Sequence, residues 1–321
     1  MRSSRVISAV CGAAFAIAGA APACAQATYP SKPIRVVTSA AGSNNDWGAR
    51  LVGEAVGPSL GQRFIVDNRG GFAAEVVAKA PPDGYTLLFY GPAAWTQHLF
   101  RDIDFDPTRD LAPITMAMSS PIVLVVHPSL PVRSVKELIA LAKAKPGQLN
   151  YASGTPGATP YLAGELFKYM AGVNIVRIAY KGTGPSMLGL LGGEVELMFP
   201  GAGSVWIHVK QGKLRALGVA STKPSQLTPG LRPIAETVPD YESTSHIAFF
   251  APAGTPKAII DRLNEEIVKA ANREDIKQLL FKGGVEPVGS TAKWLGDYVT
   301  MDVDRIKKML SAMNVDSKRA Y

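Results

Sequence analysis

The segment from Leu149 to Ser221 constrains the fold of this chain more than any other part of its sequence. Its strand candidates, which read LNYAS, NIVRIAY and VELMF, alternate with the helix candidates YLAGELFKYMAG and SMLGLLGG. The loops GTPGATP and KGTGP, built largely from Gly, Ser, Thr and Pro, follow strands and open the helices. Alternation of strand and helix predicts an α/β fold with a doubly wound sheet.

Each of these loops places a helix N-terminus at the end of a strand. Such an end carries unpaired N–H groups and a partial positive charge, so it can bind a carboxylate or phosphate without a charged side chain. Helix ends that follow neighbouring strands can face one crevice. A third copy of the design reads IRVVTS, AAGSNND and WGARLVGEAVG near the start of the chain. The sequence therefore predicts a cleft that holds a small anion.

The first residues predict a secretory leader that is not part of the fold. An apolar run at 6–20 is shorter than the roughly twenty residues of a membrane span. Residues 23–25 then match a small-x-small cleavage site. We therefore expect a signal peptide over 1–25 and a soluble protein in the periplasm. Both cysteines, Cys11 and Cys24, leave with that leader, and the alternative is that Cys24 becomes a lipid-modified N-terminus.

Composition and motifs argue against several other classes of protein. The formal net charge is +8, but no block of Lys and Arg forms the basic face typical of nucleic-acid binding. The four histidines lie far apart, so we expect no metal site and no cofactor. A GxSxG sequence at 57–61 follows a helix candidate and precedes a strand, which reverses the order of a nucleophile elbow. A binding protein fits better than an enzyme, and a hydrolase stays as the alternative.

The mature chain has room for two domains. Strand candidates lie at 34–39, 63–68, 85–91, 122–128, 149–153, 174–180, 195–200, 214–221 and 247–254. Those at 122–128 and 247–254 each precede a Pro/Gly turn and an amphipathic helix, so we interpret them as crossovers. The expected first lobe holds 26–127 and 249–321, and the second holds 128–248. Two doubly wound lobes joined by two crossover strands can close on a ligand.

Local signals mark several helix boundaries. The sequence SVKE at 134–137 is a capping box. Thr159 followed by Pro160 predicts an N-cap and a first helical residue, and Gly172 predicts the end of that helix. The tail over 256–313 is expected to be helical and to pack on the first lobe.

Eight segments carry a resemblance that covers nearly the whole mature chain. They read YPSKPIRVV, VAKAPPDGYTLL, FDPTRDLAPIT, PGQLNYASG, LAGELFKYMAGV, AYKGTGPSMLGLLGGEVELMF, GKLRALGVAS and FFAPAGTPKAIIDRLNEEI. In this order they resemble the Bug family of periplasmic solute receptors, which serve tripartite tricarboxylate transporters. The resemblance implies two lobes of the periplasmic binding protein type and a small carboxylate held largely by backbone N–H groups. It also implies a monomer whose partners are inner-membrane transporter subunits or, alternatively, a membrane sensor.

Departures from the family pattern gather at the predicted ligand loops. The first loop resembles PGGxxD but reads AGSNND over 41–46. Where the family has SxGxGSxxH, Ala158 replaces a Ser and Tyr161 replaces the His. Pro200 replaces the Asp of LMFD, and a WxG becomes an HIA that starts at His246. The scaffold therefore predicts the binding role of the family, while the loops predict an altered ligand.

The candidate ligand contacts lie on three loops, on one turn and near the hinge. The loops contribute Gly42, Ser43, Asn44 and Asp46, then Ser153, Thr155, Gly157, Ala158, Thr159 and Tyr161, and finally Tyr180, Lys181 and Gly182. The turn adds Trp95, and the hinge adds His246. Structural alternatives stay open, because Asp46 could cap a helix, Lys181 could be solvated, and Trp95 could lie in the core.

Trp95 and Tyr161 also bear on the choice of ligand. Large flat side chains with one polar tip can wall a pocket against an apolar ligand body. The replaced His and Asp leave a second strongly charged end of a ligand without an obvious partner. We therefore expect a carboxylate with an aromatic or medium-chain body.

Overall fold

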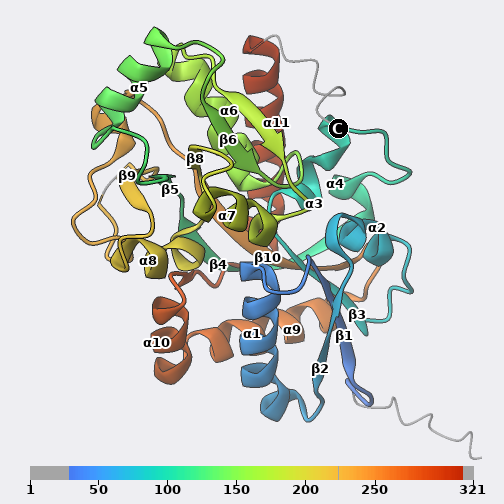
Figure 1. Cartoon of the computed structure of the whole chain (residues 1–321). Coiled ribbons are helices and arrows are strands. Elements are labelled where there is room, and N and C mark those ends of the chain that lie inside the picture. The colour runs from blue at the N-terminus through green and yellow to red at the C-terminus, as the bar shows by residue number, and fades with distance from the viewer. Residues whose placement is uncertain (1–28, 223, 314–321) are drawn as a thin grey trace, which may run out of the picture.

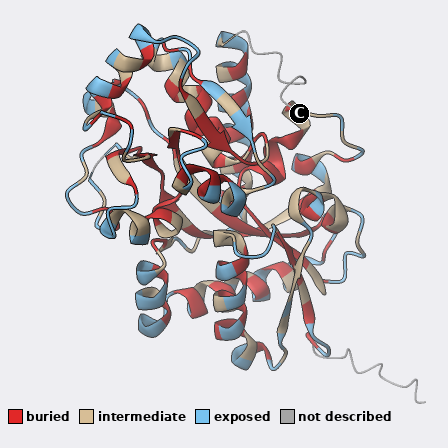
Figure 2. Ribbon diagram, in the orientation of Figure 1, coloured by how far each residue is buried: buried red, intermediate tan, exposed pale blue. Residues whose placement is uncertain are grey.

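The computed structural model describes residues 29–222 and 224–313, which form two α/β lobes (Figure 1). The predicted leader over 1–25, with its Cys24 alternative, lies outside these ranges. Within them, no helix combines the length and apolar character needed to cross a membrane. Figure 2 shows buried residues along the strands and the inner faces of the helices in both lobes. Each lobe therefore has a core of its own.

The first lobe is built on a mixed sheet. In the described ranges its six strands lie in the order β11 (Glu286–Pro287), β4 (Leu111–Pro121), β10 (Thr244–Pro252), β3 (Thr86–Tyr90), β1 (Ile34–Thr38) and β2 (Phe64–Asn68). β1 runs parallel to β2 and β3, whereas β10 runs antiparallel to β3 and β4. The central strands are buried almost throughout, as expected for strands covered on both faces.

Helices cover both faces of this sheet. One face carries α1 (Asn44–Leu60), α9 (Lys257–Ala271) and α10 (Glu274–Lys282), and the other carries α2 (Ala73–Ala78), α3 (Ala93–Thr96) and α11 (Ala292–Ala312). The short elements η1 (Gly70–Phe72), η2 (Gln97–Leu99) and α4 (Pro107–Asp110) lie in the connections. The predicted helical tail is confirmed as α9, α10 and α11, with β11 between the last two.

The second lobe repeats the design with a smaller sheet. Its described strands lie in the order β7 (Val176–Ala179), β6 (Asn150–Ser153), β8 (Leu197–Met198), β5 (Val123–Val126) and β9 (Arg215–Val219). α5 (Val135–Ala144) and α6 (Thr159–Ala171) pack on one face, and α7 (Thr183–Leu191) and α8 (Ala202–Lys210) on the other. The turn η3 (Ile234–Glu236) precedes the return to the first lobe. The doubly wound, two-lobe fold is therefore confirmed.

The chain changes sheets a few residues earlier than the sequence analysis expects. β4 stays in the first sheet up to Pro121 and β5 joins the second sheet at Val123, so 122–127 belong with the second lobe. β10 pairs with β4 from Thr244 onward, so 244–248 belong with the first lobe. Hydrophobicity identifies these strands as buried, but it does not reveal which sheet supplies their hydrogen-bond partners. We propose that the lobes divide at these two sheet changes.

The long strand β4 is not among the strands predicted from the sequence. Its sequence LAPITMAMSSP contains two prolines and two serines, which obscure the apolar pattern of a strand. Pro113 lies opposite Phe250, next to a shift in the register between β4 and β10. An irregularity of this kind accommodates a residue that cannot donate a ladder hydrogen bond.

Two of the three predicted helix boundaries are confirmed, and the third is displaced by one residue. Ser134 caps α5, because its Oγ accepts a hydrogen bond from the N–H of Glu137 at 3.1 Å. Gly172 ends α6 in the left-handed conformation, at φ 61°. The N-cap of α6, however, is Ala158 and not Thr159. α6 therefore begins without a side-chain cap.

The two lobes contact each other in at least two regions of the described chain. In one, the rings of Phe100 from the first lobe and Tyr161 from α6 meet edge to face, with centroids 5.4 Å apart. In the other, the backbone of Gly203 in α8 meets the backbone of Gly283 and Gly284 after α10. A Cβ on Gly203 would overlap the carbonyl oxygen of Gly283, so this approach depends on glycine.

Candidate functional site: a cleft between the lobes

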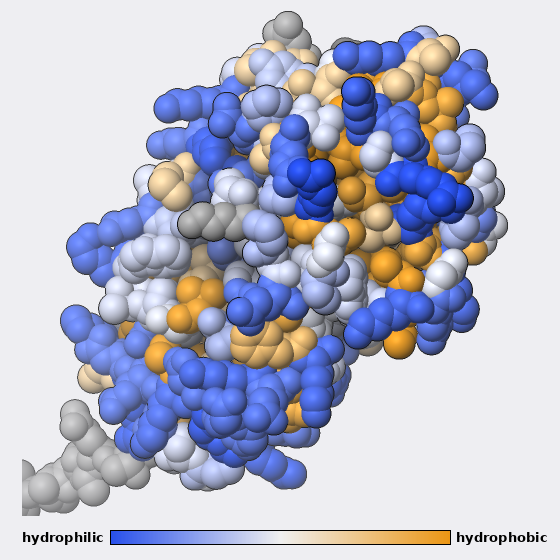
Figure 3. Space-filling view, turned by 90° about the vertical axis from the view of Figure 1, so that its left-hand side faces the viewer, coloured by the Kyte–Doolittle hydropathy of each residue, from blue (hydrophilic) through white to orange (hydrophobic). Residues whose placement is uncertain are grey.

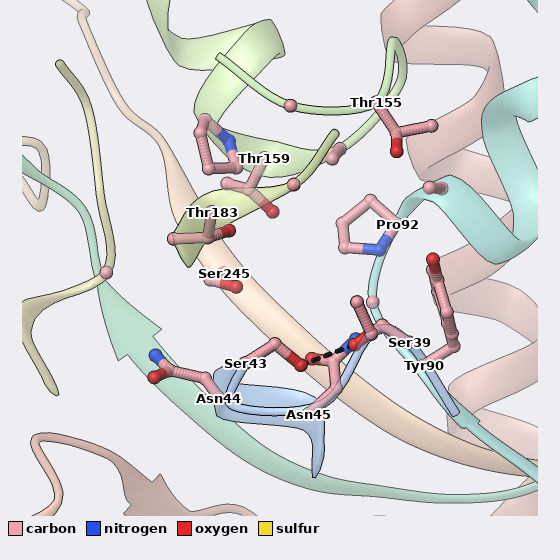
Figure 4. Close-up of a pocket in the computed structure, with 18 of the residues that line it drawn as sticks. Ser39, Ser43, Asn44, Asn45, Tyr90, Pro92, Thr155, Thr159, Thr183 and Ser245 are labelled. Carbon is pink, nitrogen blue, oxygen red and sulfur yellow. Dashed lines mark hydrogen bonds between the residues drawn. The ribbon is translucent and has the colours of Figure 1, made fainter. Parts of the chain in front are cut away.

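A cleft of about 140 Å³ lies between the two lobes (Figure 4). The first lobe lines it with Ser39, Ala40, Ser43, Asn44, Asn45, Gly70, Gly71, Tyr90, Gly91, Pro92, Ala93 and Ser245. The second lobe lines it with Ile122, Gly154, Thr155, Ala158, Thr159, Pro160, Lys181, Gly182, Thr183, Gly201 and Ser204. Most of these residues are glycines or small neutral polar residues. The cleft therefore offers backbone groups and hydroxyls to whatever enters it.

Among the described residues, four helices of nine or more residues begin at this cleft, and the short helix α3 also begins there, after Pro92. The N-cap residues of α6, α7 and α8 are Ala158, Gly182 and Gly201, all of which line the cleft, and no side chain caps any of these three helices. α1 differs, because the Ser43 hydroxyl accepts a hydrogen bond from the N–H of Asp46 at 3.2 Å. An uncapped N-terminus leaves N–H donors that need an acceptor. The second lobe therefore carries the helix ends that are suited to an anion.

Asp46 holds the first-lobe loop in place. Its carboxylate accepts hydrogen bonds from Gly42 N–H at 2.9 Å, from Asn68 Nδ2 at 3.0 Å and from Arg50 Nε at 3.0 Å. Burial alone would raise the pKa of Asp46, but these hydrogen bonds together hold that pKa below its usual range. Neither Asp46 nor Gly42 lines the cleft, so the prediction of both as direct contacts is not supported. Each shapes the loop that presents Ser43.

Arg177 supports the second-lobe loop in the same way. Its Nε donates to Ser153 Oγ at 2.8 Å, its Nη2 donates to the Gly154 carbonyl at 2.9 Å, and its guanidinium lies 4.9 Å from the centre of the Tyr161 ring. Ser153 and Tyr161 are buried and do not line the cleft. The predicted contacts at these two positions are therefore positioning residues for the loop.

Trp95 is a core residue. Its side chain is fully buried, its Nε1 donates to Asp302 Oδ2 at 2.9 Å, and its ring lies 5.8 Å from that of Phe250. Of the two roles left open for Trp95, the structure shows the one in the core. The turn after β3 does reach the cleft, but it does so through Gly91, Pro92 and Ala93. Trp95 and Tyr161 are both directed elsewhere, so neither forms the expected aromatic wall, and the aromatic residue of the described lining is Tyr90.

Three other candidates also face away from the cleft. Gly157, at φ 80°, lies against the first lobe in the contact between the lobes. Tyr180 donates its hydroxyl hydrogen to Glu194 Oε2 at 3.0 Å. His246 packs edge to face on Tyr298, with ring centroids 5.0 Å apart, and its burial lowers its pKa. In each case the loop or strand was correctly placed, but the backbone turns the side chain or the glycine toward a protein neighbour.

The remaining candidates do line the cleft: Ser43, Asn44, Thr155, Ala158, Thr159, Lys181 and Gly182. Figure 4 shows Thr159 and Thr183 on one side of the space, facing Ser43 and Asn44 on the other. Residues far apart in the sequence are thus brought together because the loops of both lobes end at one opening. Their role as ligand contacts stays a proposal.

Sequence reasoning missed several residues of the lining. Asn45 and Thr183 lie within the predicted loops, next to residues that were named. Ser204 lies in the first turn of α8, which follows a strand through a Gly-rich turn, so the rule applied to α6 and α7 would have found it. Tyr90 and Ser245 belong to strands, where no local signal distinguishes a residue facing the cleft from one facing the core.

The electrostatics of the cleft favour an anion. None of the described residues that line it is an Asp or Glu, and Lys181 is the cation among them. Nor do three or more His, Cys, Asp or Glu residues gather into a possible metal site anywhere in the described ranges. Uncapped helix ends, hydroxyls and one ammonium group can together hold a carboxylate.

Comparisons with known proteins show the family of this chain. The model of the tripartite tricarboxylate transporter family receptor matches residues 49–315. Protein BugT of Bordetella pertussis is 33% identical over 314 residues, which cover 95% of this chain and 96% of that protein. The protein "Rpa4515 with adipate" from R. palustris is 32% identical, with a TM-score of 0.85 over 89% of this chain and 98% of that one.

The solved structure of the periplasmic binding protein BugD is also similar, at 27% identity and a TM-score of 0.84, and it covers 89% of this chain and 99% of that one. The family match spans most of the described chain and both lobes of the fold. The resemblance found in the sequence is therefore confirmed. This chain belongs to the receptor family of the tripartite tricarboxylate transporters.

Proposed function

We propose that this protein is a periplasmic receptor that captures a small carboxylate between its lobes and delivers it to a tripartite tricarboxylate-type transporter. The observation that carries the proposal is the set of three helix N-termini, those of α6, α7 and α8, which open at the cleft without side-chain caps. A carboxylate supplies the acceptors that these N–H groups need. The receptor role itself is that of the family.

The size and polarity of the cleft support the same reading. Its volume of about 140 Å³ suits a small molecule, and its lining contains no described acidic residue that would repel an anion. The similar protein from R. palustris was solved with adipate, a short dicarboxylate. A linear diacid is therefore the first ligand class to test.

The test compares adipate with its dimethyl ester by titration calorimetry. We expect saturable binding of adipate and at least about hundredfold weaker binding of the ester, because the ester leaves charge-assisted hydrogen bonds unmade. Equal affinity of acid and ester would contradict the proposal. Delivery is tested separately: cells that lack their own receptor but keep the membrane subunits should take up the bound acid only when this protein is supplied.

A further inference from the structure

We propose that the cleft binds ligands with an ammonium group poorly. It therefore discriminates between a plain or hydroxylated dicarboxylate and the amino acid with the same carbon skeleton. This inference rests on the proposed function, since it concerns the same site. It follows from the hydrogen-bond acceptors of the cleft, which the protein itself already engages.

Several backbone carbonyls of the lining loops already accept hydrogen bonds from side chains of the protein. The acceptors and their donors are Ser39 O with Asn68 Nδ2 at 2.8 Å, Gly70 O with Tyr90 Oη at 3.0 Å, Gly71 O with Arg101 Nη2 at 3.2 Å, and Gly154 O with Arg177 Nη2 at 2.9 Å. Two of these donors are guanidinium groups, so they also place positive charge behind the loops.

Backbone turns engage further carbonyls of the same loops. The oxygens of Ala40, Thr155, Ala158, Gly182 and Gly201 accept hydrogen bonds from the N–H groups of Ser43, Ala158, Tyr161, Ser186 and Ser204 respectively. The hydroxyls of Ser186 and Ser204 add second hydrogen bonds to Gly182 O and Gly201 O, at 2.8 and 2.9 Å. This pattern is a direct consequence of helix initiation, which turns carbonyls into the helix and N–H groups outward. The backbone of these loops therefore faces the cleft chiefly with donors, and the acceptors that remain in the lining include the neutral side-chain oxygens of Asn, Ser and Thr residues.

No carboxylate compensates for this shortage of acceptors. Among the described residues, none of the lining is acidic. The carboxylate of the nearby Asp46 accepts hydrogen bonds from Gly42, Arg50 and Asn68. An ammonium group has three donors and no acceptor, so it would face Lys181 and the positive ends of three helices without an anionic partner. Burying a charge unpaired is costly. A hydroxyl, which can accept as well as donate, meets no such penalty.

The test uses ligands that differ in one substituent. Succinate, malate and aspartate share a four-carbon diacid skeleton with H, OH or NH3+ at one position, and glutarate, 2-hydroxyglutarate and glutamate repeat the series with five carbons. Calorimetry at neutral pH should give the hydroxy acid within about tenfold of the plain diacid and the amino acid at least about hundredfold weaker. The hydroxy acid is the control for size, because it fills the same position without the charge.

The reciprocal experiment introduces an acid into the cleft. Ser245 of β10 lines the cleft, and Figure 4 shows it at the back of the space, so an Asp side chain there would offer a carboxylate to a ligand's ammonium group. We expect Ser245→Asp to raise the affinity for aspartate relative to succinate by at least about tenfold, whereas the neutral isostere Ser245→Asn leaves the ratio unchanged. If Ser245→Asp does not fold, Ser204→Asp serves instead, because an acidic residue in the first turn of α8 is favourable to the helix.

The outcomes separate this inference from the proposed function. Amino acids that bind as tightly as the plain diacids would overturn the inference and leave the carboxylate receptor intact. An unchanged ratio in both acidic variants would also overturn it. If no diacid of either series binds, and adipate does not bind either, the proposed function fails and the inference fails with it.

Discussion

The loops of the two lobes face the same cleft, but they treat their helix N-termini differently. In the first lobe, Ser43 caps α1 by accepting a hydrogen bond from the N–H of Asp46, and Asp46 holds the loop through Gly42 N–H. In the second lobe, α6, α7 and α8 begin at Ala158, Gly182 and Gly201, none of which can supply a side-chain cap. The long helix α1 of the first lobe therefore begins with a side-chain cap, whereas the three helices of the second lobe do not.

This difference in helix capping suggests that the two lobes have different roles in ligand binding. The second lobe would grip the anion with backbone N–H groups, and the first lobe would close a preformed, braced wall over it. Leaving helix ends uncapped costs stability, since a side-chain cap contributes about 1 kcal/mol. A cost of this kind is expected at a binding site, where stability is exchanged for function.

The largest effect is expected when a helix of the second lobe receives a side-chain N-cap, as α1 of the first lobe already has. Ala158 is the N-cap of α6 and has the extended backbone of a capping residue, at φ −72° and ψ 151°. We expect Ala158→Asp to raise the melting temperature by ~2–4 °C and to weaken carboxylate binding at least about hundredfold, because its side chain occupies the helix end. Thermal melts and calorimetry on the same sample measure both effects.

Ala158→Asn is the matched control, because it caps the helix without a negative charge. It should stabilise the protein and weaken binding less than the Asp variant does. If Ala158→Asp binds the carboxylate as well as the parent protein does, the N-terminus of α6 is not part of the anion site.

The second test keeps the two lobes from meeting. A Cβ on Gly203 would overlap Gly283 O across the contact between the lobes, so Gly203→Ala should hold the cleft open. We expect at least about tenfold weaker binding and a radius of gyration that no longer decreases when adipate is added, as measured by small-angle X-ray scattering. Gly57→Ala, within α1 and with room for the added methyl group, is the control. Normal affinity and normal compaction in Gly203→Ala would contradict closure at this contact.

The third test removes the cap that the first lobe already has. Ser43→Ala should lower the free energy of unfolding by about 1 kcal/mol, because the N–H of Asp46 loses its acceptor. The carboxylate affinity should change by less than about tenfold, since the second lobe supplies the main donors. Chemical denaturation and calorimetry give the two numbers. A loss of affinity as large as that of Ala158→Asp would show that both lobes grip the anion alike.

The smallest effect concerns pH. The pKa of Asp46 is lowered in the folded protein, so the unfolded chain binds more protons between the folded and unfolded pKa values. The contribution of Asp46 to stability is therefore complete above the ordinary Asp pKa and is lost as the pH falls through the lowered value. Melting temperatures measured from neutral to acidic pH should show Asp46→Asn less stable than the parent at neutral pH. The gap should narrow in acid, and a constant gap would contradict this role.

The alternation of strands and helices, their Gly-rich loops and the capping signals allowed the sequence to predict the two lobes and the position of the cleft. What it could not predict was the direction of individual side chains. Trp95 and Tyr161 lie within two positions of lining residues in the sequence, but Trp95 donates to Asp302 and Tyr161 packs on Phe100. Such contacts join elements far apart in the chain, and local patterns do not encode them. For the same reason, the position of Ser245 at the cleft appeared only in the structure. The strand β4 was missed for another reason, because its prolines and serines obscure the apolar pattern.

The central claim is that the second-lobe helix ends hold the ligand, and a crystal structure of the protein with adipate tests it most directly. The account predicts a carboxylate group of adipate within hydrogen-bond distance of backbone N–H groups in the first turns of α6 and α7, near Thr159 and Thr183. Adipate bound outside the cleft, or held only by Ser43 and Asn44 while those first turns make no contact with it, would contradict the account.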